Sequence, residues 1–256
     1  MKKVWISYPR RIFRRELALG LIKKYVPRNA RFLDIGCGGG EFGIALSQIG
    51  FSGKMIDFSE EAGQIVEDNL EESNITNLQF EKRDFFDLSD GEEFDLAVAF
   101  EVLEHLQDDK KALIKINSLL GDGGFLLISV PAHEKLWGVA DTTVGHFRRY
   151  EKKELARLLE ETGFKTVVLD AYGYPFLNII RLFRNLLLRR TLRGFDHKDK
   201  AEGSKISGLD TVKLPSFFGY VFNKYTLLPF IQFSKLFNRF DLTEGYLCLA
   251  QKHEKK

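Results

Sequence analysis

The sequence predicts an α/β fold, in which a doubly wound, mostly parallel sheet of seven strands carries a helical insertion before its last strand. Three observations predict this fold. Short apolar runs alternate with longer segments of helical periodicity, a glycine-rich turn follows the first run, and the composition changes over residues 172–243. Alternation of this kind is typical of a parallel sheet that helices cover on both faces.

The apolar runs place the strands. We expect strands at 31–35, 53–57, 78–83, 94–100 and 124–130, a sixth after Gly163, and a last strand at 245–252. Helices are expected at 41–49, 59–72, 108–120 and 151–162. The predicted domains are an N-terminal helical cap (1–29), a core (30–171 and 244–252) and a helical insertion (172–243).

The bulk composition narrows the class of protein. The chain has 256 residues and a net charge of only +2, so bulk charge does not favour a nucleic acid as partner. Cys37 and Cys248 make no disulfide framework, which fits a reducing compartment. The N-terminus lacks the apolar core of a secretion signal, and no charge-free apolar stretch of ~20 residues occurs. We therefore expect a cytoplasmic protein without a membrane span.

The turn after the first strand has a backbone that a ligand can approach. Four of residues 36–40 are glycine, and a helical pattern follows. Glycines without Cβ atoms and the free N–H groups of a helix N-terminus form such a site; the alternative is a tight turn without a ligand. A dinucleotide loop of the form G-x-G-x-x-G would need glycine where Glu41 stands. Asp34 lies in the strand itself, where a buried carboxylate needs donors from the loop or a ligand's ammonium group.

Five segments in order resemble the motifs of class I S-adenosylmethionine-dependent methyltransferases, which have a Rossmann-like fold. They are "LDIGCGGG", "MIDFSEEA", "KRDFFDL", "FDLAVAFEVLEHLQDD" and "LLGDGGFLLISVP". The subgroup most similar in appearance includes the ubiquinone-biosynthesis O-methyltransferases. The resemblance covers roughly residues 30–171 and the last strand. It implies transfer of a methyl group from S-adenosylmethionine to an oxygen or nitrogen of a small-molecule or lipid-like acceptor, with S-adenosylhomocysteine as product.

The resemblance also implies which residues hold the cofactor. Asp57 is expected to accept hydrogen bonds from the ribose hydroxyls, and Asp84 to face the adenine amine; the alternatives are a plain surface acid and a loop residue. Asp34 is expected to stabilise the loop or the amino group of the cofactor. The complete expected set is Asp34, Gly36, Cys37, Gly38, Asp57, Phe58, Asp84, Phe85, Phe100 and Glu101.

The chemistry is expected to come from the loops after the fourth and fifth strands. An imidazole suits proton removal at neutral pH, and a long connection, "VPAHEKLWGVADTTVGHFRRYEKKEL", is rich in functional side chains. The expected catalytic residues are His133, His146 and Tyr150, and the expected acceptor-binding residues are His105, Trp137, Arg148 and Arg149. Alternatively, the histidines make structural hydrogen bonds, and the arginines pair with Glu101, Glu104 or Glu151. No cluster has metal-ligand spacing, so no metal is expected.

The insertion differs from the rest of the chain. Residues 172–243 hold 12 Lys and Arg against 5 Asp and Glu, together with 14 aromatic residues. Apolar residues recur at helical spacing from Phe176, with Arg181, Arg184 and Arg189 on the other side. We expect a lid, a surface that rests on an anionic membrane, or both, which would place the protein peripherally on the inner face of the membrane. The basic N-terminal segment could lie beside it.

Other classes of protein remain as alternatives. The first is a non-catalytic protein that keeps the cofactor fold for binding or assembly, against which the intact Asp34, Gly36 and Asp57 argue. The second is an NAD-dependent oxidoreductase, which Glu41 and Asp34 disfavour. The third is an RNA methyltransferase, although no RNA-binding module is visible.

Overall fold

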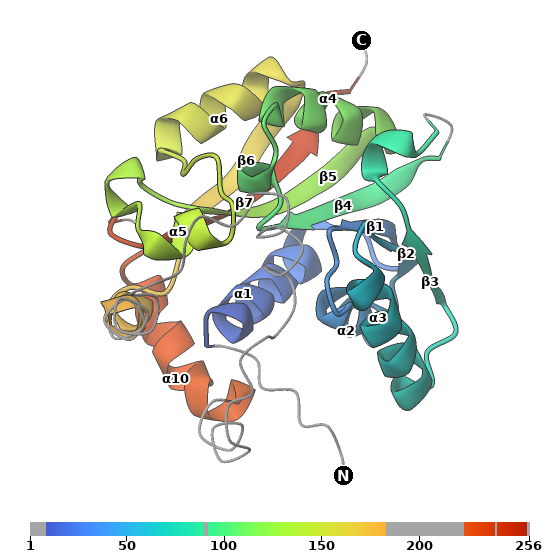
Figure 1. The fold of residues 1–256 in the computed structure, drawn as a ribbon, viewed down its shortest axis with the longest axis horizontal. Coiled ribbons are helices and arrows are strands. Elements are labelled where there is room, and N and C mark those ends of the chain that lie inside the picture. Colours follow the sequence, from blue (N-terminus) through green and yellow to red (C-terminus); the bar gives the residue numbers. More distant parts are fainter. Residues whose placement is uncertain (1–8, 90–91, 183–222, 239, 255–256) are drawn as a thin grey trace.

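The computed structural model describes residues 9–89, 92–182, 223–238 and 240–254, which form one sheet with helices on both faces (Figure 1). The strands are β1 (Arg31–Ile35), β2 (Ser52–Asp57), β3 (Leu78–Lys82), β4 (Phe94–Phe100), β5 (Leu120–Pro131), β6 (Phe164–Ala171) and β7 (Gly245–Lys252). Their order is β3-β2-β1-β4-β5-β7-β6, with β7 antiparallel to both neighbours and all other pairs parallel. The predicted fold class is confirmed.

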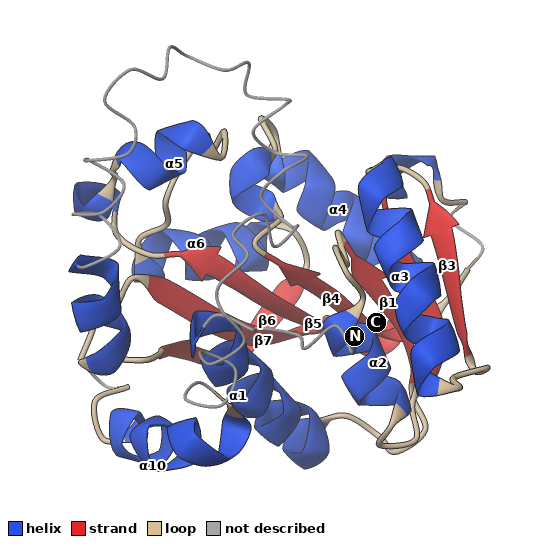
Figure 2. Cartoon of the chain, turned by 60° about the horizontal axis from the view of Figure 1, so that its bottom comes forward, coloured by secondary structure: helices blue, strands red, loops and turns tan. Residues whose placement is uncertain are grey.

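The helices divide between the two faces of the sheet. They are α1 (Pro9–Tyr25), α2 (Glu41–Ser47), α3 (Glu60–Ser73), α4 (Asp109–Leu119), α5 (Val139–Thr143), α6 (Lys152–Glu161) and α10 (Lys224–Lys235), with short 3-10 turns η1 (Phe85–Asp87), η2 (Leu103–His105) and η3 (Glu134–Leu136). Helices α4 and α6 cover one face, and α1 and α2 cover the other (Figure 2).

The alternating side chains of the strands build two hydrophobic cores. Leu33 and Ile35 of β1 belong to the core under α4 and α6, whereas Phe32 belongs to the core under α1 and α2. The same alternation separates Ala97 from Leu96 in β4. Because successive strand residues point to opposite faces, a strand that is apolar at every position is expected at the centre of such a sheet.

The strand order reverses between β1 and β4, and this reversal positions the site. The chain moves outward through β2 and β3 on one side of β1, and through β5 on the other side of β4. At such a switch point the loops after neighbouring strands diverge and leave a crevice at their carboxyl ends. The glycine loop after β1 and the Glu101–His105 segment after β4 both lie at this edge.

The predicted element bounds agree closely with the observed ones, with one difference. Strand β5 begins at Leu120 rather than at residue 124, because α4 ends directly in extended backbone and Leu120 pairs with Phe94 before a register shift. Among the described residues of the insertion, 176–182 and α10 are helical; Arg184 and Arg189 lie outside them. Within the described part of the chain, no helix has the length and apolar character needed to cross a membrane.

Candidate active site at the carboxyl ends of the strands

The glycine loop adopts backbone conformations that other residues rarely take. Gly36, Gly38 and Gly40 have φ values of 65°, 53° and 74°. The N–H groups of Gly36 and Cys37 both donate to the carbonyl of Ile56, at 2.9 and 3.1 Å, which ties the loop to β2. A Cβ on Gly36 would lie 2.7 Å from Val102 Cγ2. The positive φ and the close approach of Val102 both require glycine at this position.

Asp34 is a buried carboxyl group with one unsatisfied oxygen. Only 3% of the residue is exposed, and its Oδ2 has no hydrogen-bond partner among the described residues. Burial raises its pKa to about 7, an effect that the charge of Arg14 and a hydrogen bond from the Gly43 backbone partly oppose. An unpaired buried acceptor is costly, so its presence under the glycine loop fits a ligand that brings a donor such as an ammonium group.

Asp57 organises the loop from the end of β2. Its Oδ2 accepts a hydrogen bond from Gly38 N, and its Oδ1 accepts one from Ser59 N, both at 2.9 Å. Each carboxylate oxygen has a second lone pair, so these contacts leave room for ribose hydroxyls. Phe58 follows with 49% of its surface exposed, which makes its ring available to a ligand. The predicted contact of Asp57 and Phe58 with the cofactor is compatible with these positions, and it stays a prediction.

Asp84 and Phe85 have structural roles in the loop after β3. Asp84 Oδ1 accepts a hydrogen bond from Phe86 N at 3.0 Å and so caps η1. Phe85 is buried, and its ring centroid lies 4.2 Å from that of Phe86. Asp84 is exposed, so its second oxygen remains accessible. The cap explains why an acid stands here without a ligand, and the adenine contact stays a prediction.

Two arginines of α1 reach the end of β4. Arg10 Nη2 lies 2.8 Å from Glu101 Oε2, and Arg14 Nη1 lies 3.5 Å from Glu101 Oε1. The Arg14 guanidinium also lies 4.6 Å from the centroid of the Phe100 ring. Burial alone would raise the pKa of Glu101, but Arg10 and Arg14 hold it at about 2. The sequence analysis missed both arginines, although the basic N-terminal segment was a signal for them.

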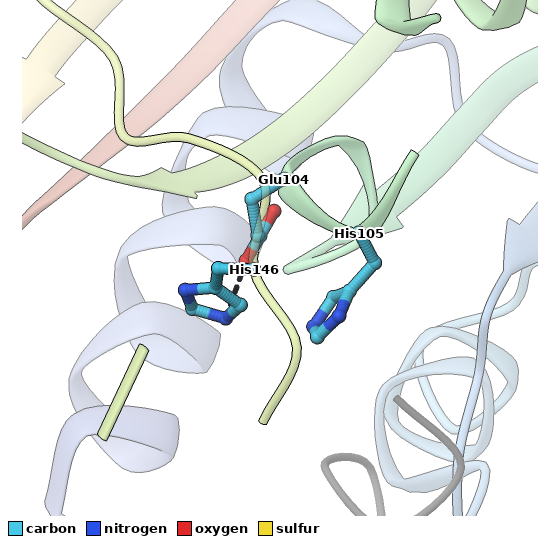
Figure 3. Close-up of side chains that lie close together, drawn as sticks. All are labelled: Glu104, His105 and His146. Atoms are coloured by element: carbon cyan, nitrogen blue, oxygen red, sulfur yellow. Dashed lines mark ion pairs between the residues drawn. The ribbon is translucent and has the colours of Figure 1, made fainter. Parts of the chain in front are cut away.

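Three side chains with metal-binding donor atoms meet beside Glu101. In Figure 3, Glu104 and His105 of η2 and His146 of the long loop point toward one another. One potential ligand atom from each lies within 4.8 Å of the others, a grouping that could hold a divalent cation. The sequence showed no metal-ligand spacing because His146 follows the other two by some 40 positions. The prediction that no metal binds stays a prediction.

Burial shifts the pKa of two side chains in this cluster, Glu104 and His105. Glu104 is fully buried, and neither of its carboxyl oxygens has a hydrogen-bond partner among the described residues. Burial, followed by the charge of Glu101, raises the pKa of Glu104 well above its usual value. Burial and His146 lower the pKa of His105 to about 4. Burial thus favours the protonated form of Glu104, and His105 is an uncharged imidazole at neutral pH.

A buried ion pair orients His146. Asp141 Oδ1 lies 2.9 Å from His146 Nδ1, while His146 Nε2 lies 3.9 Å from Glu104 Oε1, beyond hydrogen-bond distance. Arg149 donates to both oxygens of Asp141, from Nε at 2.9 Å and from Nη2 at 3.0 Å. Asp141 and Arg149 are 2% and 8% exposed. Asp141 was not among the predicted site residues, because its partners could not be read from the sequence.

Three of the predicted site residues have partners within the protein, and their predicted roles stay predictions. The buried Tyr150 hydroxyl donates to Asp109 Oδ2 at 2.9 Å, and burial raises its pKa, which argues against a catalytic proton acceptor. The Nε, Nη1 and Nη2 groups of Arg149 are engaged by Asp141 and the Ala132 carbonyl, which leaves little for an acceptor. Arg148 pairs with Asp109 at 2.8 Å. The arginines thus pair with aspartates rather than with the glutamates considered from the sequence.

The described contacts of His133 and Trp137 are with residues other than Glu104, His105 and His146. His133 is buried between two acids, with Nδ1 3.1 Å from Glu151 and Nε2 3.2 Å from Asp241. It therefore connects the loop after β5 to the residues before β7, a structural role that competes with the predicted catalytic one. Trp137 is 38% exposed and donates from Nε1 to Thr142 Oγ1 at 3.3 Å. No described contact joins either residue to the cofactor loop.

Comparisons with known proteins show the family to which the chain belongs. A family model described as a methyltransferase domain matches residues 8–169, and the chain belongs to this family. A ubiquinone biosynthesis O-methyltransferase of Thiobacillus denitrificans is 26% identical over 167 residues, which cover 59% of this chain and 72% of that protein. The enzyme of the same description from Coxiella burnetii is 29% identical over 130 residues, which cover 50% of this chain and 53% of that protein.

Solved structures share the fold over most of the chain. Coclaurine N-methyltransferase superposes with a TM-score of 0.57 at 16% identity, covering 93% of this chain and 72% of that one. A phosphoethanolamine N-methyltransferase of Haemonchus contortus gives 0.58 at 18% identity, covering 94% and 53%. The [4+2]-cyclase SpnF gives 0.60 at 17% identity, covering 94% and 81%, so the fold also hosts other chemistry.

The family match, the fold and the motifs agree on the class of enzyme. The protein is a class I S-adenosylmethionine-dependent methyltransferase, as the resemblance of its motifs predicted. The names of these proteins indicate different acceptors. The solved structures, at less than 25% identity, show only that the fold is shared. These comparisons do not identify the acceptor or the catalytic residues of this chain.

Proposed function

We propose that this methyltransferase binds S-adenosylmethionine at the glycine loop and transfers its methyl group to an oxygen of a small-molecule or lipid-like acceptor. The observation that carries the proposal is the Asp141–His146 pair, which faces Glu104 at the same edge of the sheet as the glycine loop. An oxygen acceptor must lose a proton, and a held imidazole can take it. The names of the O-methyltransferase relatives support oxygen over nitrogen.

The chain offers complementary groups to each part of the cofactor. Asp34 Oδ2, buried and unpaired among the described residues, would accept from the ammonium group, and Arg14, whose charge acts on Asp34, would attract the carboxylate. Asp57 would accept from the ribose hydroxyls with its remaining lone pairs. When bound, S-adenosylmethionine supplies a methyl carbon that the sulfonium has already activated. The protein then has to align the acceptor, exclude water and remove one proton.

His146 is the proton acceptor in this proposal. When Nδ1–H donates to Asp141, the lone pair remains on Nε2, which is the nitrogen that faces Glu104. Asp141 also stabilises the imidazolium that forms when the proton is taken. Burial raises the pKa of Glu104 and so favours its protonated form, in which it could donate a hydrogen bond to the acceptor.

Replacement of His146 tests the base directly. The His146→Gln variant should lose about 10²–10⁴-fold in kcat while its affinity for S-adenosylmethionine in calorimetry stays unchanged. His253→Gln is the matched control, because His253 is about half-exposed and its Nε2 lies 3.5 Å from Glu160 near the C-terminus. Wild-type activity in the His146→Gln variant would exclude His146 as the base.

Treatment with a chelator distinguishes a role of His146 as the base from a role as a metal ligand. The same Asp141–His146 arrangement would also orient a metal-bound imidazole. The proposal expects activity to survive extensive treatment with EDTA. Activity that is lost on chelation and restored by a divalent cation would instead assign His146 to a metal site with Glu104 and His105.

The phase in which the methylated product is recovered identifies the acceptor class. Extracts supplied with the protein and methyl-labelled S-adenosylmethionine are separated into organic and aqueous phases after the reaction. A lipid-like acceptor places the label in the organic phase, and a polar small molecule places it in the aqueous phase. Label in protein or RNA would contradict the proposed acceptor class.

A further inference from the structure

Helix α10 is apolar on opposite sides. Its inner stripe consists of Leu227, Ile231 and Ser234, which are almost fully buried, and the helix packs against α1. On the other side, Tyr225, Phe233 and Leu236 have exposed fractions of 75%, 52% and 69%. A helix that is apolar all round is expected to be covered on every side. Here the described part of the protein covers one stripe only.

The exposed apolar residues continue beyond the helix. Leu228 on α10, and Phe240 and Leu242 after it, have exposed fractions of 44%, 56% and 50%. We call the set of Tyr225, Leu228, Phe233, Leu236, Phe240 and Leu242 the α10 surface. Isolated exposed apolar side chains are ordinary, but a contiguous group marks a surface that binds a protein or a membrane.

Aromatic contacts hold this surface to the body of the enzyme. Phe230 on α10 stacks on Phe176, with ring centroids 4.9 Å apart, and Phe176 stacks on Phe13 of α1 at 5.7 Å. Phe237 lies between Phe233 and Tyr174, at 5.2 and 5.5 Å. Because α1 also carries Arg10 and Arg14, the α10 surface is rigidly connected to the helix that reaches the active site.

The charged residues of α10 itself are lysines, and the one acid within the α10 surface, Asp241, is held by the Tyr246 hydroxyl at 2.7 Å and lies 3.2 Å from His133 Nε2. No Asp or Glu occurs from Asn223 to Phe240, and Lys224 and Lys235 stand at the two ends of α10. Arg181, which the sequence also suggested for a membrane surface, lies 3.7 Å from the buried Glu244, and its side chain is only 22% exposed. The positive charge therefore comes from the lysines of α10, which flank the exposed aromatic residues.

We propose that the α10 surface rests on an anionic lipid bilayer. Aromatic and aliphatic side chains flanked by lysines suit the boundary between headgroups and acyl chains, and a helix without carboxylates avoids repulsion by anionic lipids. A protein partner is less favoured because interface cores are depleted in lysine and this surface has a lysine at each end of its helix. The inference does not depend on the methyl acceptor or on the catalytic base.

Co-sedimentation of the full chain with vesicles tests the proposal. The protein should bind vesicles that contain phosphatidylglycerol and should bind pure phosphatidylcholine vesicles much more weakly. Each lysine near an anionic surface contributes about 1 kcal/mol, so the Lys224→Gln/Lys235→Gln variant should bind about thirtyfold more weakly. The Phe233→Ser/Leu236→Ser variant should lose at least about tenfold, including the part of binding that persists at high salt.

A double variant on α4 is the matched control. Ile114 is 53% exposed and Lys110 is an exposed lysine; both belong to α4, and Figure 1 shows α4 on the opposite side of the molecule from α10. The Lys110→Gln/Ile114→Ser variant should bind vesicles as the wild type does. Affinity for S-adenosylmethionine, measured on every variant, shows that the core remains folded.

Three results would contradict membrane binding by the α10 surface. Wild-type protein that ignores anionic vesicles at low salt would mean that something else covers the α10 surface. If light scattering shows a dimer that the Phe233→Ser/Leu236→Ser variant abolishes, that cover is a second copy of the chain. Equal losses of vesicle binding in the α4 control and the α10 variants would place the contact elsewhere.

Discussion

The carboxylate of Asp141 fixes the imidazole of His146. Asp141 Oδ1 lies 2.9 Å from His146 Nδ1, and the His146 backbone N–H donates to the Asp141 carbonyl at 3.0 Å. The side chain of Asp141 thus holds the ring of His146, and the backbone carbonyl of Asp141 holds its backbone N–H. This double attachment leaves His146 Nε2 as the only ring nitrogen that can face an acceptor.

Replacing Asp141 should therefore impair catalysis through His146. In the Asp141→Asn variant, the ring loses its charged partner and can adopt the other tautomer. We expect kcat to fall by about 10²–10⁴-fold with little change in affinity for S-adenosylmethionine. Steady-state kinetics and calorimetry on the same preparation check this. A fall in affinity with kcat unchanged would show that Asp141 serves only the structure of the cofactor site.

Arg149 should matter more to stability than an exposed arginine does. Its removal leaves the buried Asp141 without its ion-pair partner, so Arg149→Gln should lower the free energy of unfolding by about 3–5 kcal/mol. Arg157→Gln is the matched control, because Arg157 is 82% exposed and pairs with Glu161 one helical turn away. Its loss should cost less than about 1 kcal/mol. Urea denaturation measures both, and equal costs would refute the buried pair.

Acid pH should weaken the fold through the same pair. Burial opposes ionisation of Asp141, but hydrogen bonds from His146 and Arg149 lower its pKa to about 2. Because the folded-state pKa lies below the ordinary aspartate value of 3.8, the stabilisation by the ionised Asp141 is present above pH 4 and is lost as the pH falls toward 2. The free energy of unfolding of the wild type should fall faster over that interval than that of Asp141→Asn. Parallel pH profiles would contradict the assignment.

Asp34 should give the opposite pH dependence. Its folded-state pKa is raised from 3.8 to about 7, so the folded protein retains a proton that the unfolded chain releases. Its contribution to stability is complete below pH 4 and is lost as the pH rises through 7. The Asp34→Asn variant should therefore become more stable relative to the wild type across this window, by at most about 4 kcal/mol. Denaturation at pH 4.5, 6 and 8 checks this, and a constant difference would refute it.

Gly36 should not tolerate a side chain. A Cβ would lie 2.7 Å from Val102 Cγ2 at a φ of 65°, so Gly36→Val should destabilise the protein by about 1–3 kcal/mol and abolish cofactor binding. Gly20→Ala is the control, because nothing lies within 4 Å of its Cβ and it stands within α1. That change should stabilise the protein by up to about 1 kcal/mol. Thermal melts compare the two, and intact cofactor binding in Gly36→Val would refute the loop assignment.

The sequence predicted the parts of the site that local patterns determine. Asp34, the glycine loop and Asp57 follow strands whose apolar runs are unambiguous, and parallel strands bring their carboxyl ends to one edge. These residues lie where the sequence placed them. The sequence indicated that a ligand approaches the glycine loop, whereas the structure adds Val102, which comes from a different strand-end loop and lies close to Gly36.

The contacts that the sequence could not predict join distant segments. Arg10 reaches Glu101 because α1 packs across the sheet, and nothing local in either segment indicates this pairing. Arg149 pairs with Asp141 because the short helix α5 turns the loop back on itself. In both cases, tertiary packing selects one acid among several that local charge would allow.

Calorimetric titration with S-adenosylhomocysteine tests the central claim that the cofactor lies between the glycine loop and Asp57. The wild type should bind, and so should Asp122→Ala, because Asp122 is exposed at the amino end of β5, away from the site. Asp57→Ala should lose about 1–3 kcal/mol, or about 5- to 150-fold in affinity, because its charged acceptor is gone. No binding by the wild type, or equal binding by wild type and Asp57→Ala, would contradict the account.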